Sequence, residues 1–176
     1  MCMVKQVDRL ITAFLEYLEV ERGRSPKTIR NYDFYLRRFT KWAKAPEPKA
    51  ITIEMVHKYR LWLNRKVAGR DGKTLKKTTQ NYHLIALRSF LKYLARKDIP
   101  SLSPEKIELA KQEQREVAFL EVEELDRLLA APKGVDLVTL RDRAILEMLF
   151  STGLRVSEIS NLKIEQVNLK RDEFTV

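Results

Sequence analysis

The sequence predicts a mainly α-helical protein, in which a bundle of four to five helices precedes a truncated α+β domain. Glycine and proline are scarce, at five and six of 176 residues, so most of the chain is free to form helices. Apolar residues recur three and four positions apart through the first hundred residues, the spacing of helices that bury one face. The polar stretch 109–117 lacks this period. It is expected to link a first domain, 1–108, to a second, incomplete domain, 118–176.

Three helices are expected in the first half of the bundle. The first covers about 4–21, where apolar residues follow helical spacing. Ser25-Pro26 begins the second helix, since serine is a good N-cap and proline suits the first helical position. Thr52 caps the third helix in the same manner.

The fourth helix, about 75–96, has the clearest apolar stripe. Its leucines alternate three and four apart, at Leu84, Leu87, Leu91 and Leu94. A short fifth helix is expected after Ser103-Pro104, because serine followed by proline is again a helix-start pattern. These helices, joined by short loops, indicate a compact α-bundle.

The second region is expected to hold two helices and then a strand. Leucines mark one helix near 125–129, and an apolar run marks the next at 140–150. The charged run 170–173 is typical of a turn, and Phe174 begins a strand without an evident partner. Because a single strand is not stable by itself, the chain is expected to end inside a larger domain.

Composition excludes several classes of protein. No apolar run approaches the roughly 20 residues that span a membrane, and the N-terminus lacks the apolar core of a signal peptide. The single cysteine, Cys2, excludes an internal disulfide. A cytoplasmic protein with no membrane partner is expected.

The net charge of +10 is distributed unevenly. Residues 1–100 hold 23 lysines and arginines against nine acids, a balance of +14, while 101–176 hold 11 against 15, a balance of −4. A basic domain joined to a mildly acidic one indicates a polyanionic partner for the first. On charge alone, a lysine-rich soluble domain without such a partner is the alternative.

Two surfaces of the first domain are candidates for binding double-stranded DNA. Hydroxyls and helix N-termini bind phosphates, lysine and arginine add long-range attraction, and Asn81 or Arg88 could reach base edges. The fourth helix carries no acid before Asp98. For each residue taken singly, solvated helix surface is the alternative. The candidates are Arg24, Ser25, Lys27, Thr28 and Asn31 at the start of the second helix, and Lys76, Lys77, Thr78, Thr79, Asn81, Arg88 and Lys92 on the fourth.

Arg155 is the candidate for phosphate chemistry. The apolar stretch 144–150 leads into Gly153, and Arg155 is then expected on the first turn of another helix, with Glu158 three residues later. Free N–H groups at a helix start favour an anion, and the guanidinium matches two phosphate oxygens. Glu158 is placed to hold Arg155. The alternative is an ordinary helix-start ion pair between these two residues.

The stretch Thr152-Gly153-Leu154-Arg155, continuing through Ser157-Glu158 to Asn161-Leu162, resembles the first arginine motif of the tyrosine recombinase (phage integrase) family, Xer-like branch. Residues 14–32 are similar to the opening of that family's core-binding domain, which is a SAM-like helical bundle. Residues 77–94 resemble its fourth helix, and 119–125 resemble the start of the catalytic domain. The resemblance therefore covers nearly the whole chain in the right order.

The resemblance implies site-specific DNA strand exchange. In that family a tyrosine attacks the scissile phosphate and forms a 3′-phosphotyrosyl bond, with no metal or nucleotide cofactor. The catalytic set comprises an arginine, a hairpin lysine, a His-x-x-Arg pair, a further His or Trp, and the tyrosine. Arg155 matches the first arginine, and Glu158 matches its acidic companion.

No tyrosine follows Arg155, so the nucleophile is expected to be missing. The chain alone is then expected to bind duplex DNA as a monomer without cleaving it. The resemblance implies full-length recombinase subunits, four on two duplexes, as the further partners.

Other histidine patterns are not assigned a role. His57 and Arg60 form His-x-x-Arg as a string, but they precede Arg155 and fall on the third helix. His83 has no cysteine or carboxylate at ligand spacing, so no metal site is expected. Two other functions stay open: a non-catalytic protein that occupies DNA sites, and a helical transcription regulator.

Overall fold

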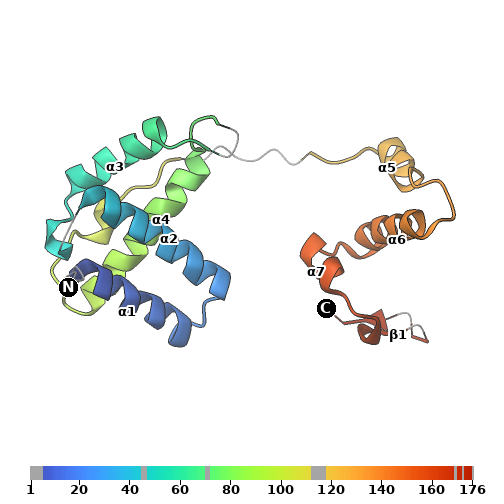
Figure 1. Ribbon diagram of the computed structural model, residues 1–176, viewed down its shortest axis with the longest axis horizontal. Helices are drawn as coiled ribbons and strands as arrows, with labels where there is room; N and C mark the ends of the chain where they lie inside the picture. Colours follow the sequence, from blue (N-terminus) through green and yellow to red (C-terminus); the bar gives the residue numbers. More distant parts are fainter. Residues whose placement is uncertain are drawn as a thin grey trace. The chain divides into compact units, whose positions relative to one another are not determined.

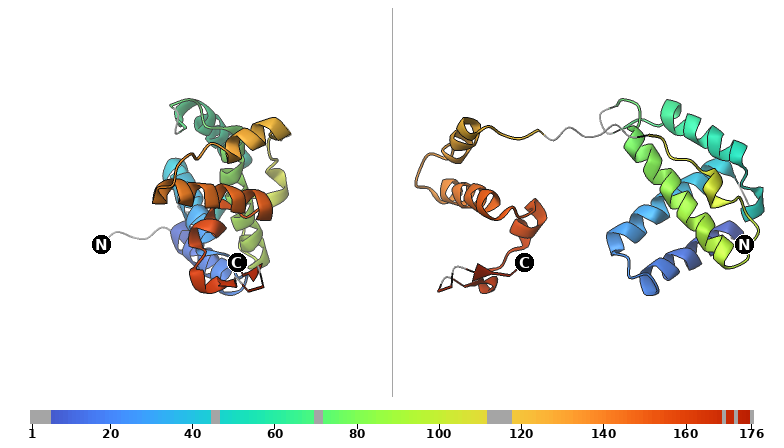
Figure 2. Two further views of the ribbon diagram at one scale, coloured as in Figure 1. Left: turned by 90° about the vertical axis from the view of Figure 1, so that its right-hand side faces the viewer. Right: turned by 180° about the vertical axis from the view of Figure 1, so that it is seen from behind.

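The computed structural model describes residues 6–44, 47–69, 72–111, 118–168, 170–171 and 173–175. The chain divides into two compact units, residues 1–114 and 115–176 (Figures 1 and 2). Each unit is considered by itself. Of the expected linker 109–117, residues 112–117 lie outside the described part. None of the described helices is long and apolar enough to cross a membrane.

Unit 1 is a bundle of α-helices, which confirms the predicted fold class. Figure 1 shows α4 crossing α2, with α1 and α3 placed against this pair. Two single turns of 3-10 helix, η1 and η2, connect the longer elements. The helices are α1 (Gln6–Val20), α2 (Pro26–Ala43), α3 (Ile53–Lys66) and α4 (Lys77–Arg96), with η1 at Pro48–Ala50 and η2 at Pro104–Lys106.

The predicted helix starts at Ser25 and Thr52 are confirmed. Ser25 Oγ accepts a hydrogen bond from the Thr28 amide at 3.3 Å, with Pro26 at the first helical position. Thr52 Oγ1 accepts from the Met55 amide at 3.2 Å. Each hydroxyl satisfies an amide that the first turn of a helix leaves without a partner.

The expected fifth helix is only the 3-10 turn η2. Pro104 begins it as predicted, but Ile107 already has extended backbone. The Ile107 side chain is 1% exposed and belongs to the core of the bundle. Burying this side chain requires the backbone to leave the helical path, which ends the turn.

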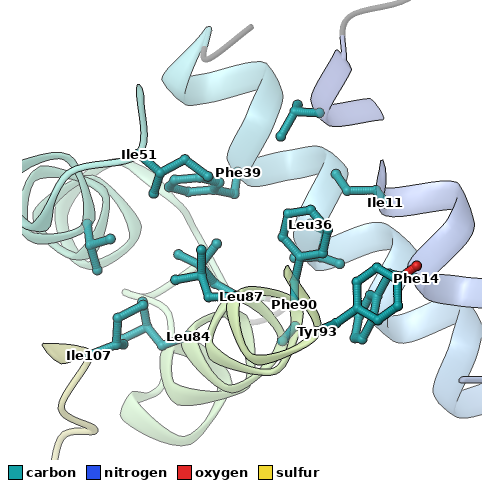
Figure 3. Close-up of a cluster of buried hydrophobic side chains, with 14 of the residues drawn as sticks. Ile11, Phe14, Leu36, Phe39, Ile51, Leu84, Leu87, Phe90, Tyr93 and Ile107 are labelled. Carbon is teal, nitrogen blue, oxygen red and sulfur yellow. The ribbon is translucent and has the colours of Figure 1, made fainter. Parts of the chain in front are cut away.

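The core of unit 1 is built mainly on α4. Leu84, Leu87 and Phe90 pack against Leu36 and Phe39 of α2 and Ile11 of α1, as Figure 3 shows. The predicted leucine stripe of α4 is confirmed, since its four members are at most 1% exposed. Full burial of one such side chain stabilises the fold by about 1.5–3 kcal/mol. This packing fixes the crossing of α2 and α4, and thereby the surface that the two helices share.

Unit 2 has three α-helices and a short hairpin. None of its described residues, at 118–168, 170–171 and 173–175, is buried. Large apolar side chains such as Phe119, Leu137 and Ile164 are exposed by 77–84%. The elements are α5 (Val122–Leu129), α6 (Leu137–Thr152), α7 (Val156–Asn161), the 3-10 turn η3 (Ile164–Gln166), β1 (Val167–Asn168) and β2 (Glu173–Phe174).

The expectation of an unpaired strand at Phe174 is wrong. β2 pairs antiparallel with β1, with Val167 opposite Phe174 and Asn168 opposite Glu173. The pair is closed beyond the strands by the Thr175 amide, which donates to the Gln166 carbonyl at 3.2 Å. Lys170 and Arg171 of the charged run lie in a turn, whereas Glu173 already belongs to β2. The strand's partner is the segment just before that turn.

Candidate functional site

A basic pocket lies where the end of α1, the start of α2 and one face of α4 meet. Its volume is about 190 Å³. Among the described residues that line it, none is acidic. Aromatic rings of Phe14, Tyr17, Tyr32 and Tyr93 form much of its wall. Its polar lining, which defines the basic pocket below, consists of Arg22, Arg24, Thr28, Ser89, Lys92 and Arg96.

The local sequence explains how α1 leads into this pocket. Gly23 has a φ of +55°, a left-handed conformation that favours glycine. The turn brings the Arg24 amide back to donate to the Leu18 carbonyl at 2.9 Å. Ser25 then caps α2, and its Oγ lies 3.0 Å from Thr28 Oγ1. The positive end of the α2 dipole, which has no acid in its first turn, thus lies beside the cationic side chains.

One cation of the basic pocket is held in place by α1. Arg96 Nη1 donates to Tyr17 Oη at 2.7 Å, across a sequence separation of 79 residues. The Tyr17 ring contacts Tyr93 and Phe14, with centroid separations of 5.1 and 6.5 Å. Because Tyr17 accepts without adding negative charge, the Arg96 guanidinium keeps its full charge and further N–H donors for an anion.

Three predicted residues, Arg24, Thr28 and Lys92, come together in the basic pocket. Ser25 lies at its edge through the contact with Thr28. Lys27 and Asn31 are exposed on the outer side of α2. The sequence reasoning did not select Arg22 or Ser89. Ser89 precedes Lys92 by three residues and Arg96 follows it by four, so all three lie on one face of α4. This spacing was the signal that could have found Ser89.

A second hollow lies at the start of α4. Its volume is about 640 Å³, and we call it the α4-start hollow. Lys76, Thr79 and Arg38 supply its polar lining, and Phe34, Tyr35 and His83 its aromatic side. Lys77 and Thr78 are exposed on the adjoining first turn. The predicted residues of the α4 start therefore share one surface, although Arg88 and Asn81 have other surroundings.

Asn81 is 2% exposed and its amide is fully engaged. Its Nδ2 donates to the Ala110 carbonyl at 2.8 Å, and its Oδ1 accepts from the Ala110 amide at 3.0 Å. Both polar atoms face the returning chain, so a base edge has no donor or acceptor to meet there. We therefore leave Asn81 out of the proposed DNA surface.

Arg88 and Lys92 of α4 lie close to the carboxylate of Glu105, which belongs to η2. η2 brings Glu105 beside α4. The pKa of Glu105 is lowered by its own backbone amide and by Ser103 Oγ, 2.9 Å away, and further by the charges of Lys92 and Arg88. Arg88 is half-buried, with its Nε shielded from solvent and without a hydrogen bond. Lys92 is exposed and remains the stronger candidate for contact with an anion.

The histidines take no part in this surface as acids or bases. His83 is 2% exposed, and its Nδ1 lies 3.0 Å from Tyr59 Oη. Burial, and secondly the charge of Arg38, lower the pKa of His83 to about 4, so the ring is neutral near pH 7. His57 is exposed on α3. Across the described residues, no cluster of three or more potential metal-binding side chains occurs.

Arg155 lies at the N-cap of α7 rather than in its first turn. Gly153, with a φ of +66°, ends α6 and turns the chain toward α7. Glu158 Oε2 accepts from the Arg155 amide at 2.7 Å, and Oε1 accepts from its guanidinium at 2.9 Å. These hydrogen bonds, with the charge of Arg155, lower the pKa of Glu158. The Arg155 side chain is still 81% exposed, so most of its donors face outward.

Comparison with known protein families follows the two units. Residues 11–98, half of the chain, match the family described as "Phage integrase, N-terminal SAM-like domain", and residues 118–176 match the "Phage integrase family". The chain belongs to the phage integrase, or tyrosine recombinase, family. The two matches correspond to the core-binding domain and to part of the catalytic domain of these recombinases.

Curated relatives of this recombinase chain carry the names XerC and XerD. It is 39% identical to tyrosine recombinase XerC of Pelobacter propionicus over 160 residues, which cover 90% of this chain and 52% of the relative. It is 30% identical to XerC of Bacillus subtilis over 98% of this chain and 56% of that protein. A crystal structure of XerA recombinase is 28% identical, covers 94% of this chain and 53% of that one, and has a TM-score of 0.46. The chain thus spans about half the length of the relatives that it matches.

Proposed function

We propose that this chain is the DNA-binding portion of a Xer-like site-specific recombinase. Unit 1 binds the phosphates of duplex DNA, and unit 2 supplies Arg155 as one phosphate ligand of a reaction centre. The observation that carries the proposal is the basic pocket, in which four cations and two hydroxyls from the α1–α2 turn, α2 and α4 converge without an acid among the described lining residues. Hydroxyls, cations and a helix N-terminus are the groups that proteins most often present to phosphate oxygens.

We expect the lysine and arginine side chains of the basic pocket and of the α4-start hollow to contact phosphates of the same duplex. If the surface makes 6–10 phosphate contacts, affinity falls by about 10³–10⁵ between 50 and 200 mM salt, because bound counterions are released. Replacement of Lys92 or Arg24 by alanine removes one contact and lowers the slope of log affinity against log salt by about 0.9. Lys58→Ala is the matched control, because Lys58 is exposed on α3 outside both hollows.

The test is a fluorescence titration of a labelled duplex at several salt concentrations, for the wild-type chain and these three variants. A flat salt dependence contradicts the proposal. An equal change for Lys58→Ala and Lys92→Ala also contradicts it, since the binding would then follow net charge and not this surface.

Arg155 is proposed to neutralise charge on the phosphoryl oxygens during strand cleavage. Donors of this kind contribute roughly 3–4 kcal/mol each to transition-state stabilisation. The present sequence has no tyrosine after Arg155, so we propose that the 176-residue chain binds DNA without cleaving it. A covalent protein–DNA adduct on a nicked duplex would contradict this. In a longer form that cleaves DNA, Arg155→Ala should abolish cleavage and leave the affinity of unit 1 for DNA unchanged.

The exposed apolar side chains of α5 and α6 fit the same proposal. Val122 is 68% exposed and Leu137 is 84% exposed. Exposed apolar surface on a helix usually packs against another segment or a partner protein. Since the relatives are about twice as long as this chain, we propose that further catalytic-domain segments cover these faces in the complete recombinase.

A further inference from the structure

An aromatic cluster occupies the crossing of α2 and α4. Phe34 and Tyr35 on α2 lie edge to face, with centroids 5.6 Å apart. The Tyr35 ring lies 4.4 Å from the His83 ring on α4. Burial, and secondly the neighbouring Tyr82, raise the pKa of Tyr35. Tyr82 directly precedes His83 on α4. Phe34, Tyr35 and His83 line the α4-start hollow, and the basic pocket lies further along both helices.

Two of these rings face solvent. Tyr82 is 54% exposed and Phe34 is 55% exposed, whereas Tyr59 in the core is fully buried. Tyr82 precedes Ser89 by seven residues, or nearly two full turns, so the two side chains leave α4 on the same face. Ser89 lines the basic pocket. Exposed aromatic side chains beside a basic surface indicate a partner with both charged and apolar parts.

The dimensions of α4 suit the DNA major groove. Thr79 and Lys92 are separated by 13 residues, or about 20 Å at about 1.5 Å per residue. The same 13 residues turn the helix so that the two side chains point about 140° apart around its axis. The groove is about 12 Å wide and admits an α-helix, so the Thr79 hydroxyl and the Lys92 amine can face phosphates on opposite sides. Tyr82 lies between these two ends, where a helix in the groove faces base edges. Asn81, the neighbouring polar residue, is directed into the protein.

We propose that Tyr82 is a specificity-determining residue that contacts thymine methyl groups in the major groove. Thymine is the base that presents a methyl group there, and aromatic and other apolar side chains pack on it. Phe34 on α2 lines the α4-start hollow, and the cations of that hollow and of the basic pocket hold the phosphates. This inference rests on the proposed binding of duplex DNA and adds to it the base that is read.

The experiment begins with selection of preferred sequences by the wild-type chain from duplexes with a randomised centre. Each thymine in a selected duplex is then replaced in turn by deoxyuridine, which lacks only the methyl group. Wild-type affinity should fall about fourfold at the contacted thymine, the effect of losing one buried methylene-sized group. Tyr82→Phe should keep this sensitivity, because the ring is retained. Tyr82→Ala should bind the thymine and deoxyuridine duplexes equally.

Lys92→Ala is the matched comparison. It should weaken binding to both duplexes by the same factor and lower the salt slope, since a phosphate contact does not read the base. Circular dichroism of each variant establishes that the bundle is folded, as expected for changes at exposed positions.

Equal sensitivity to deoxyuridine in wild type and Tyr82→Ala overturns the inference. Selection that yields no preferred sequence also overturns it, although salt-dependent binding would then still support the proposed function. A wild-type chain that binds no duplex at all overturns both.

Discussion

The side-chain amide of Asn81 forms two hydrogen bonds with the backbone of Ala110, one donated and one accepted. The contact joins the first turns of α4 to the segment that leaves the bundle, 29 residues later in the sequence. Ile107, three residues before Ala110, is buried in the same core. Together these two contacts fix where the chain departs from unit 1.

Asn81→Ala should lower the free energy of unfolding of unit 1 by about 1–3 kcal/mol, because a buried amide pairing is lost. It should leave DNA affinity unchanged, since Asn81 is not on the proposed binding surface. Urea denaturation and the duplex titration measure the two effects. Asn64→Ala is the control. Asn64 is exposed and its Oδ1 accepts from Gln80, so its removal should change stability by at most about 0.5 kcal/mol. A loss of DNA affinity specific to Asn81→Ala would argue for a base contact.

Ser25 allows the capping and phosphate-binding roles to be separated. Ser25→Ala removes the acceptor for the Thr28 amide and should cost about 1 kcal/mol of stability. Ser25→Asp keeps a capping oxygen and should retain wild-type stability, but its negative charge at the edge of the basic pocket should repel phosphate. Thermal unfolding and duplex titration should therefore rank the two variants in opposite orders. Unchanged DNA affinity of the Ser25→Asp variant would show that DNA phosphates do not bind near Ser25.

His83 should make the stability of unit 1 depend on pH. Its pKa is about 4 in the folded chain against 6.5 for an unperturbed histidine, so the unfolded state binds the proton more readily. The stabilisation is fully present above about pH 6.5 and is lost as the pH falls toward 4. Between pH 7 and pH 5 the loss should be roughly 2 kcal/mol.

The His83 contribution can be separated from that of the carboxylates by substitution. Urea denaturation of His83→Gln should show a smaller loss of stability over this pH interval than wild type. His57→Gln changes an exposed histidine and should retain the wild-type loss. If His83→Gln and wild type lose the same stability, the buried ring is not the titrating group.

The two units should differ in hydrogen exchange. Amides of α4 lie in a helix whose apolar face is fully buried, and they should exchange only when the bundle unfolds. Amides of α6 lie in a helix without a buried residue and should exchange faster by orders of magnitude. Mass spectrometry of peptides from 84–94 and 140–150 measures this. Equal protection of the two peptides would show that unit 2 is more stable in isolation than its burial indicates.

Local chemistry made the main helices predictable. The hydroxyls of Ser25 and Thr52 accept hydrogen bonds from amides three residues away. The apolar residues of α4 recur three and four positions apart, and this spacing indicates which face of the helix is buried. Such signals lie within one or two turns of the chain. The candidates Arg24, Thr28 and Lys92 were also visible as cations and hydroxyls at helix surfaces, although nothing in their own segments showed that they share one pocket.

Contacts between distant segments were not predictable from single segments. The burial of Asn81 depends on Ala110 returning to α4, and the charge beside Arg88 depends on η2 bringing Glu105 there. The partner of β2 was missed because β1 has only two residues, too few for an alternating pattern. Arg155 was placed one residue too far into its helix because Glu158 caps the backbone as well as the side chain.

The turn at Gly153 gives Arg155 an unusual kind of support. An added Cβ at Gly153 would meet no atom within 4 Å, so the left-handed φ of +66°, and not a close neighbour, is what favours glycine here. The left-handed torsion of this residue turns the chain from α6 to α7, and the two helices contact each other. A residue with a Cβ at position 153 would therefore strain the backbone without a steric clash. The strain would act on the turn that carries Arg155 and Glu158, and unit 1 would be unaffected.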